Sequence, residues 1–221
     1  MIDQLYKALE AKTKDAGAAV FEKSGMTNRY NELEFGFFPF GTGNLSGNGK
    51  DMERCHTMIL GNDFGAEGYL DGCVEKGRRE SESNPTIKNL KLLNLDQNTT
   101  FYTNFHLGVR RSDSNIERSE KLQPEFTALC YDYFLEQLRI AQPEVVICLG
   151  NDVRLSLIQA SEVFTPWGPK SRSLKSLYEN GQFNLQVNDP SLGQRRFIII
   201  PHPCDTRNLT ATHIERINGV L

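Results

Sequence analysis

The sequence lacks any hydrophobic run long enough to cross a membrane. A transmembrane helix needs about 20 consecutive apolar residues, and every apolar stretch in this chain of 221 residues is far shorter. The opening segment, MIDQLYKALEAKTKD, is amphipathic and carries acidic residues, unlike a secretion signal or an arginine-rich transit peptide. We therefore expect a cytoplasmic protein with no membrane contact.

Closely spaced cysteine pairs are also missing. The chain has five cysteines, an odd number, and no Cys-x-x-Cys pair, which argues against a disulfide framework. The four histidines are scattered, without the paired spacing of a zinc site. We therefore expect reduced thiols, no metal and no cofactor. The cysteines are Cys55, Cys73, Cys130, Cys148 and Cys204.

The chain has no excess of positive charge, since its formal net charge is −3. Proteins that coat nucleic acids usually carry a basic face, so this balance argues against broad coating. A local basic groove is still compatible with it, because the field over a site depends on nearby charges. The absence of a Gly-x-Ser-x-Gly elbow and of a P-loop disfavours an unrelated α/β hydrolase acting on a small nucleotide or ester.

Four short segments predict buried strands. Each is mostly apolar at its centre and is bounded by polar, Gly or Pro residues. Nearly continuous apolar character, rather than strict alternation, is typical of parallel strands that are covered on both faces. The predicted strands are Thr57–Gly61, Phe101–His106, Glu144–Gly150 and Arg196–Pro201.

Helical periodicity falls between and around these strands. The strongest pattern covers residues 124–142, where Pro124 suits the first turn and an apolar stripe follows. Strands that alternate with helices predict a three-layer α/β/α sandwich around a four-stranded parallel sheet, in one domain. Further predicted helices cover residues 2–13, 85–94 and 209–219, and predicted loops cover residues 36–49, 72–84 and 107–121.

Polar side chains follow the predicted strands. Asp63 comes after the first strand, Asn104 lies near the end of the second, and Asp152 follows the third. His202 comes directly after the last strand. Ligands bind beyond the carboxyl ends of the strands in an open parallel sheet. We therefore expect a carboxylate, an amide and an imidazole to converge on one edge.

These strand ends resemble the motifs of the uracil-DNA glycosylase superfamily. The run GNDFG (61–65) is similar to its first motif, and HPC (202–204) is similar to its His-Pro-Ser motif. Between them, YTN (102–104) with the downstream LGVRR resembles the family's Thr-Asn strand end. The block from Cys130 through PEVVICLG resembles its long helix and following strand. The resemblance covers roughly residues 57 to 208.

The chain departs from the family pattern in two motifs and in its cysteines. Phe64 stands where the family usually has Pro, and Cys204 stands where it usually has Ser. The iron–sulfur branches of the family use four cysteines, of which only Cys130 has a counterpart here, so we expect no cluster. These departures indicate an outlying branch, with a substrate other than uracil or with little activity as open alternatives.

The resemblance implies cleavage of an N-glycosidic bond in DNA. In that interpretation Asp63 stabilises the sugar cation and orients a water, and His202 donates to the anion that develops on the base. Asn104 pairs with the edge of the base, Gly61 and Asn62 contribute to base binding, and backbone N–H groups around Gly61–Gly65 hold water or phosphate. An aromatic face stacks on the base, for which the candidates are Phe64, Tyr69 and Phe105.

The predicted partner is DNA, bound by a monomer through Arg110, Arg207 and Asn208. Arg207 and Asn208 follow the His motif, where the family inserts a loop into the minor groove. Leu209 is either a wedge in that loop or the first core residue of the last helix. Arg110 has the alternative interpretation of a solvated turn residue.

Several of these side chains also have a purely structural interpretation. Asp63 and Asp152 could cap the helices that follow their strands, and Asn104 could close the end of its strand. His106 and His56 are interpreted as ordinary half-buried histidines.

Two functions from different classes follow from these residues. One is a DNA glycosylase acting on uracil or another deaminated base in base excision repair. The other is a module with the same fold that binds a nucleobase or a nucleic acid but does not catalyse a reaction on it. The net charge of −3, Phe64 and Cys204 favour the second function, and the complete Asp63, Asn104 and His202 set favours the first.

Overall fold

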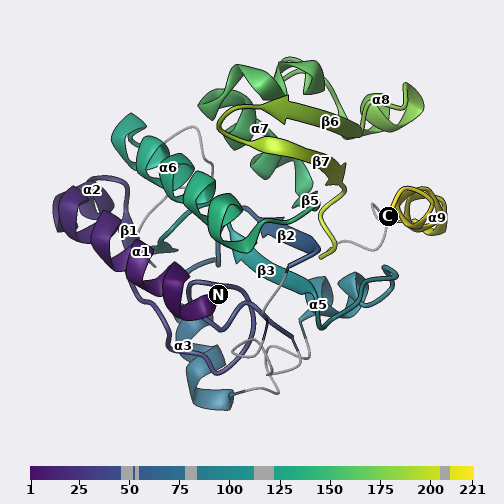
Figure 1. Ribbon diagram of the computed structural model, residues 1–221. Helices are drawn as coiled ribbons and strands as arrows, with labels where there is room; N and C mark the ends of the chain where they lie inside the picture. The colour runs from purple at the N-terminus through teal and green to yellow at the C-terminus, as the bar shows by residue number, and fades with distance from the viewer. Residues whose placement is uncertain (46–51, 53–54, 78–83, 112–121, 205–209) are drawn as a thin grey trace.

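A five-stranded, mostly parallel sheet forms the centre of the molecule (Figure 1). The computed structural model describes residues 1–45, 52, 55–77, 84–111, 122–204 and 210–221. The strands lie in the order β3-β2-β5-β7-β6, and helices flank the sheet. Their bounds are β2 Thr57–Gly61, β3 Thr100–Asn104, β5 Val145–Leu149, β6 Asn184–Asp189 and β7 Gly193–Ile200.

The predicted strands are confirmed as β2, β3, β5 and β7. Every residue of β2, β3 and β5 is buried, and so is the apolar second half of β7. β2 pairs in parallel with β3 and with β5, and β5 pairs in parallel with β7. The continuous apolar runs therefore correspond to parallel strands, and their carboxyl ends meet along one edge of the sheet.

The prediction of four strands, all of them parallel, is wrong. A fifth strand, β6, pairs with β7 in antiparallel fashion at the edge of the sheet. Its sequence, NLQVND, has one buried side chain, Val187, and the other positions are half-buried or exposed. An edge strand of this kind carries no apolar run, so hydrophobic pattern alone does not reveal it.

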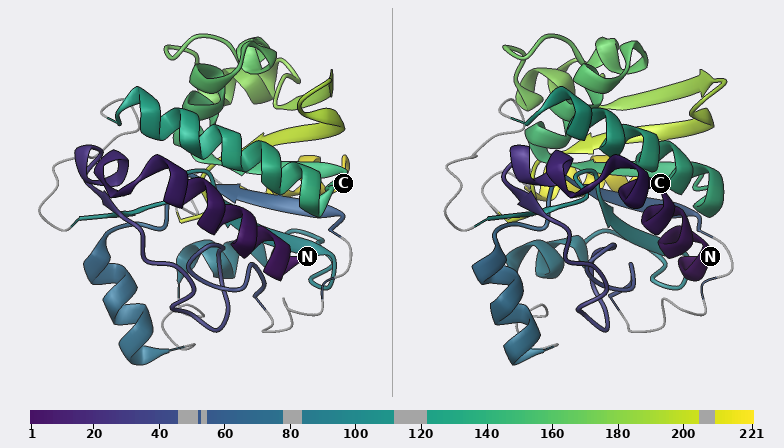
Figure 2. Two further views of the ribbon diagram at one scale, coloured as in Figure 1. Left: turned by 60° about the vertical axis from the view of Figure 1, so that its left-hand side comes forward. Right: turned by 90° about the vertical axis from the view of Figure 1, so that its left-hand side faces the viewer.

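Two helices, α1 (Ile2–Ala16) and α6 (Pro124–Ala141), run side by side (Figure 2). Both confirm predicted helices, and α6 begins at the predicted proline. The Tyr133 hydroxyl of α6 donates a hydrogen bond to the Leu5 carbonyl oxygen of α1 at 2.7 Å. Their packing contributes to one large hydrophobic core that also takes in the central strands.

The remaining helices are shorter. Two of them, α5 and α9, confirm predicted helices but cover fewer residues than the predicted 85–94 and 209–219. None of the described helices is both long and apolar enough to span a membrane. These helices are α2 Ala18–Lys23, α3 Glu67–Lys76, α5 Pro85–Leu90, α7 Gly150–Ala160, η3 Glu162–Trp167, α8 Leu174–Glu179 and α9 Ala211–Asn218.

Two predicted loops contain regular structure. The helix α3 extends into the predicted loop 72–84, and its Leu70 and Cys73 are buried at helical spacing. Within the predicted loop 107–121, β4 (Val109–Arg110) pairs with β1 (Met26–Thr27) in antiparallel fashion. A polar segment with a few apolar residues at the right spacing can thus form a short helix or strand when those residues pack against the rest of the protein.

The described part of the predicted loop 36–49 has no helix, and its strand character is limited to isolated bridges. Phe38 bridges to Thr103, and its backbone N–H donates to the Tyr102 carbonyl oxygen at 2.9 Å. The loop thereby covers the outer edge of β3. The Phe38 and Phe40 side chains are fully buried beneath it.

Candidate functional site

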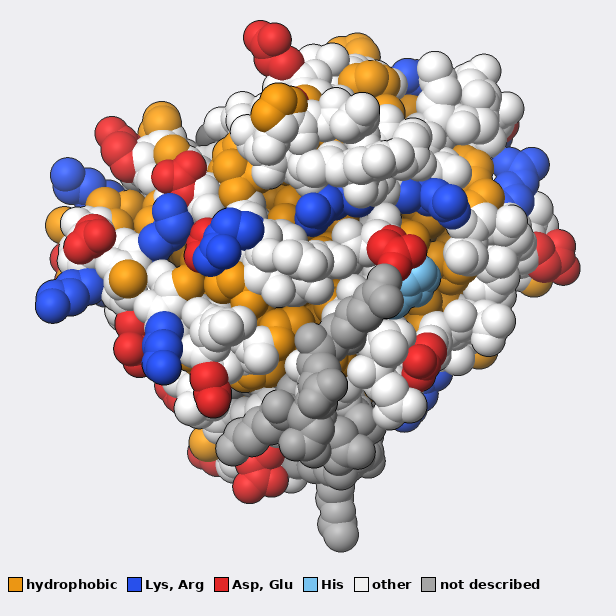
Figure 3. Space-filling model, viewed as in Figure 1, with side chains coloured by type: hydrophobic (Ala, Val, Ile, Leu, Met, Phe, Trp, Pro, Cys, Tyr) orange, Lys and Arg blue, Asp and Glu red, His pale blue; other side chains and the backbone are white. Residues whose placement is uncertain are grey.

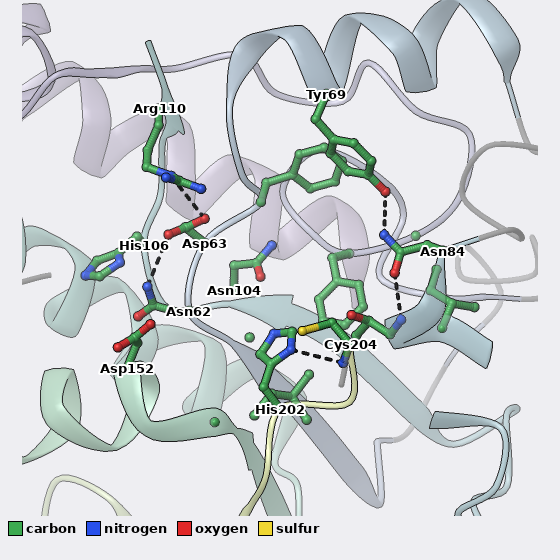
Figure 4. Close-up of a pocket in the computed structure, with 18 of the residues that line it drawn as sticks. Asn62, Asp63, Tyr69, Asn84, Asn104, His106, Arg110, Asp152, His202 and Cys204 are labelled. Carbon is green, nitrogen blue, oxygen red and sulfur yellow. Dashed lines mark hydrogen bonds and ion pairs between the residues drawn. The ribbon is translucent and has the colours of Figure 1, made fainter. Parts of the chain in front are cut away.

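A cavity of about 500 Å³ lies at the carboxyl ends of the parallel strands (Figure 4). Its volume falls within the usual range for small-molecule sites. Side chains from the ends of β2, β3, β5 and β7 contribute to its wall, so the predicted convergence of strand ends is confirmed. The predicted site residues that line it are Gly61, Asn62, Asp63, Phe64, Asn104, Arg110 and His202.

Asp63 faces the cavity from the loop after β2. One carboxylate oxygen accepts a hydrogen bond from Asn62 Nδ2 at 3.1 Å, and the other lies 3.6 Å from Arg110 Nε. Ser156 of α7 in turn donates to Asn62 Oδ1 at 3.4 Å. The next helix, α3, has Ala66 at its N-cap and no capping side chain, so Asp63 does not serve as a helix cap. The carboxylate is held in place by its neighbours and points into the cavity.

His202 follows β7 and is a neutral imidazole with a defined tautomer. Burial lowers its pKa below the ordinary 6.5, although the charges of Asp152 and Asp63 act in the opposite direction. Its Nδ1 atom accepts a hydrogen bond from the Cys204 backbone N–H at 3.2 Å. Because Nδ1 is the acceptor, the proton of the neutral ring is assigned to Nε2. His202 therefore offers the cavity a neutral N–H donor.

Two contacts hold the His202 loop in position. The buried Asn89 amide of α5 donates a hydrogen bond to the Pro203 carbonyl oxygen. On the other side Gly150, with φ of +84°, packs so closely that a Cβ there would lie 3.0 Å from His202 Cβ. The positive φ and this close approach both favour glycine. The loop is thus fixed by α5 on one side and by the start of α7 on the other.

Asn104 closes β3 and has an unused donor. Its side chain is only 2% exposed, and Nδ2 has no hydrogen-bond partner in the described part of the chain. Its Oδ1 packs directly on Gly61, where any Cβ would overlap it. A buried amide that only closed a strand would be expected to have its hydrogen bonds satisfied. The open Nδ2 favours the binding interpretation of this residue.

Of the three aromatic candidates, two line the cavity. Phe64 and Tyr69 lie in its wall and pack against each other with ring centroids 5.7 Å apart. Phe105 is fully buried and packs on Phe134 at 6.0 Å, so the proposal that it stacks on a ligand is wrong. Phe37, from the Gly/Phe loop, also lines the cavity next to Gly61 and was missed by sequence reasoning.

His106 was also missed as a site residue. It was interpreted as half-buried, but it is 1% exposed and lines the cavity beside Asp63 and Asn62. Burial lowers its pKa from 6.5 to about 4, so the ring is neutral near pH 7, and neither ring nitrogen has a hydrogen-bond partner among the described residues. The available signal was its spacing of two from Asn104, which places both side chains on one face of the chain.

The other histidine, His56, lies away from the site. It precedes β2, at the opposite end of the strand from Asp63, and its Nδ1 lies 3.4 Å from Glu144 Oε2. Its side chain is about half exposed. The interpretation of His56 as a histidine without a role in the site is therefore consistent with its position.

Of five more residues that the sequence singled out, two lie on the cavity wall and three lie outside the described part of the chain. Asp152 lies on the cavity wall in the first turn of α7 but makes no capping hydrogen bond, so the prediction that it caps the helix is wrong. Cys204 is exposed and also lines the cavity. Arg207 and Asn208, predicted to contact DNA, lie outside the described residues, as does Leu209.

Among the described residues, the charged side chains on the cavity wall are two acids and one base. Asp63 and Asp152 carry the negative charge, and Arg110 carries the positive charge and already faces Asp63. Within the described ranges, no group of three or more His, Cys, Asp or Glu side chains is arranged to hold a metal ion. The interior of the cavity is therefore better suited to a neutral, polar ligand than to a phosphate group.

The chain matches no known protein-family model and no curated protein.

Proposed function

We propose that this protein is a DNA glycosylase that hydrolyses the N-glycosidic bond of uracil or another deaminated base. The observation that carries the proposal is the arrangement of Asp63, Asn104 and His202 around one cavity. A fixed carboxylate, an unused amide donor and a neutral imidazole N–H are the groups that this reaction needs. The motifs at the same strand ends support membership of the uracil-DNA glycosylase superfamily and its fold.

The donors of the cavity favour a deaminated base. Deamination replaces an exocyclic amino group, which donates hydrogen bonds, with a carbonyl oxygen, which accepts them. Asn104 Nδ2 is unpartnered, and the Nε2–H of His202 is directed by the hydrogen bond at its Nδ1. Both therefore suit carbonyl oxygens. A parent base with an amino group would leave one of these donors unpaired beneath the bound base, at a cost of about 1–3 kcal/mol.

His202 and Asp63 act at opposite ends of the breaking bond. As the C1′–N bond breaks, its electron pair leaves with the base, and the N–H of His202 stabilises the negative charge on the base oxygen. Positive charge develops on the sugar, and the Asp63 carboxylate stabilises it. A water then bonds to C1′ and gives up one proton to Asp63. The products are an abasic sugar and the anion of the base, which takes up a proton from solvent, while Asp63 releases its proton to solvent.

The alternative is a nucleobase- or nucleic-acid-binding module that does not turn over. The observation that favours it is the state of Asp63, which is tied to Asn62 and faces Arg110. The net charge of −3 also gives little general attraction for DNA. On the face viewed in Figure 3, basic and acidic side chains are interspersed rather than gathered by sign.

The decisive experiment incubates the protein with single- and double-stranded oligonucleotides that carry uracil, hypoxanthine or xanthine. Alkali then cleaves the strand at abasic sites. We expect excision of at least one base and a loss of about 100-fold or more in Asp63→Asn and His202→Ala. Asp132→Asn and His56→Ala, which lie outside the cavity, are the matched controls.

Excision that persists in both cavity variants would contradict the assigned roles. Absence of excision on every substrate, together with binding of the free bases or salt-sensitive binding of DNA, would favour the binding module instead.

A further inference from the structure

His106 is a second imidazole in the cavity, is fully buried, and is not used by the proposed mechanism. Its ring is fixed by aromatic neighbours, with Phe126 stacked at a centroid distance of 6.1 Å and Phe105 edge-on at 5.2 Å. Neither neighbour supplies a hydrogen bond, and both ring nitrogens are without a partner in the described part of the chain. An imidazole buried in this way is costly unless something in the cavity pairs with it.

The backbone places His106 directly alongside Asp63. The parallel register of β2 and β3 runs from Thr57 opposite Thr100 to Gly61 opposite Asn104. Two hydrogen bonds continue this ladder past the strand ends, from Phe105 N–H to the Gly61 carbonyl oxygen and from His106 N–H to the Asn62 carbonyl oxygen, both at 2.8 Å. The two segments thus stay hydrogen-bonded up to His106 and to the residue before Asp63, and the two side chains lie near each other in the cavity (Figure 4).

The electrostatics agree with this placement. The Asp63 charge is close enough to raise the pKa of His106, against the larger effect of burial, which lowers it. The neutral ring has one nitrogen with a proton and one without. A neutral ring beside an ionised carboxylate gives two hydrogen-bond acceptors on the same side of the cavity.

We propose that His106 and Asp63 together hold the attacking water of the glycosidic hydrolysis. This inference rests on the proposed glycosylase function and names a second water-binding residue in it. The water donates one hydrogen to the Asp63 carboxylate and the other to the unprotonated ring nitrogen of His106. A lone pair of its oxygen is then left free to face C1′ of the sugar.

The step balances with these groups alone. The C1′–N bond breaks and its electron pair leaves with the base, and the water oxygen then forms a bond to C1′ of the sugar cation. The first water proton passes to Asp63. The second proton stays on the new hydroxyl group, and His106 keeps its own proton throughout. His106 therefore positions the nucleophile and does not serve as the base.

The test compares His106→Leu with His106→Asn and His106→Gln. The leucine variant removes both ring nitrogens. The asparagine and glutamine variants each restore a hydrogen-bond acceptor, at two different distances from the backbone. With saturating enzyme on a uracil oligonucleotide, we expect the single-turnover rate of His106→Leu to fall about 10- to 100-fold. One of the amide variants should recover part of that loss. Binding of free uracil should change less than about twofold, because His106 does not contact the base.

A competition between water and methanol separates water positioning from a merely structural role. Methanol has one hydroxyl hydrogen and can satisfy Asp63 but not His106 as well. The wild-type protein should therefore favour water over methanol, and His106→Leu should raise the fraction of 1′-O-methyl product severalfold. Mass spectrometry of the DNA strand measures this fraction, and thermal melting checks that each variant is folded.

The outcomes distinguish this inference from the proposed function. An active wild-type protein whose His106→Leu variant keeps its rate and its water-to-methanol ratio would overturn the inference alone. Equal losses of rate and of uracil affinity in every folded variant would also overturn it. A wild-type protein that excises no base would overturn the proposed function, and the inference with it.

Discussion

At the scale of single residues, the cavity depends on positions where a side chain is absent. Gly61 lies under the Asn104 amide, and a Cβ at residue 61 would overlap Asn104 Oδ1. Gly61 does not have a positive φ, so its backbone is open to other residues. Glycine is needed here for the close approach of the amide rather than for the backbone conformation.

We therefore predict that Gly61→Ala weakens base binding with little effect on folding. The displaced Asn104 amide should lose its hydrogen bonds to the base, at a cost of about 1–3 kcal/mol, which corresponds to roughly 5- to 150-fold in affinity. Titration of the protein with free uracil measures this. Gly72→Ala in α3, where a Cβ would meet no atom within 4 Å, is the matched control. Equal uracil affinities in both variants would contradict the prediction.

The neutral state of His202 sets the pH dependence of base excision. Burial lowers the pKa of His202 below 6.5, so the ring is neutral at higher pH and becomes protonated as the pH falls through that lowered value. A protonated ring can no longer accept the Cys204 N–H at Nδ1. We predict a constant single-turnover rate near neutral pH and a decrease at a pH below 6.5.

The charge of Asp152 raises the pKa of His202. The variant Asp152→Asn should therefore move this acidic limb of the pH–rate profile to lower pH. A shift to higher pH would contradict the assignment.

At the scale of elements, α5 holds the His202 loop. Asn89 is buried in this helix, and its amide donates to the Pro203 carbonyl oxygen, one residue beyond His202. Asn84 is the N-cap of this helix, and its side chain accepts a hydrogen bond from the Thr86 backbone N–H at 2.8 Å. A short helix with a defined start thereby positions the end of β7.

We predict that Asn89→Ala lowers both stability and excision. The Pro203 carbonyl oxygen would lose its partner, which costs about 1–3 kcal/mol when the group stays buried, and the freed loop would let His202 move. Urea unfolding and single-turnover excision measure the two effects. Lys88→Ala, an exposed neighbour on α5, is the control. If Asn89→Ala kept full activity and stability, the hydrogen bond would have no positioning role.

At the scale of the whole molecule, a buried neutral histidine links stability to pH. His106 has a pKa of about 4 in the folded protein and an ordinary value of 6.5 when exposed. Between these values the unfolded chain binds the proton and the folded protein does not. The contribution of His106 to the free energy of unfolding is therefore fully present above pH 6.5 and is lost as the pH falls toward 4.

We predict that this decrease amounts to roughly 3 kcal/mol, taking 1.36 kcal/mol for each pKa unit. The free energy of unfolding, measured with urea at several pH values, should decrease less steeply with acid in His106→Leu than in the wild-type protein. Other groups with lowered pKa values, such as His202, contribute to both proteins and cancel in the comparison. Parallel pH profiles of the two proteins would refute the assignment to His106.

The hydrophobic pattern of the sequence determined the central strands and the edge at which the site forms. In the apolar runs Val145–Leu149 and Phe197–Ile200, the side chains on both faces of the strand are apolar. A sheet with one face in water would expose half of them, so the runs predicted parallel strands that are covered on both faces. The polar residues directly after such strands then predicted Asp63 and His202 at the same edge. The burial of a strand and the point at which it ends are local properties, because the types of a few consecutive residues indicate both.

The tertiary structure alone decided which side chains the cavity uses. Phe64, Tyr69 and Phe105 are equally plausible stacking residues in the sequence, yet Phe64 and Tyr69 line the cavity whereas Phe105 packs into the core. The edge strand β6 forms only because β7 offers it hydrogen bonds, and Phe37 reaches the site only because its loop covers β3. Each of these features depends on contacts between residues far apart in the chain, and such contacts leave no periodic signal in the sequence.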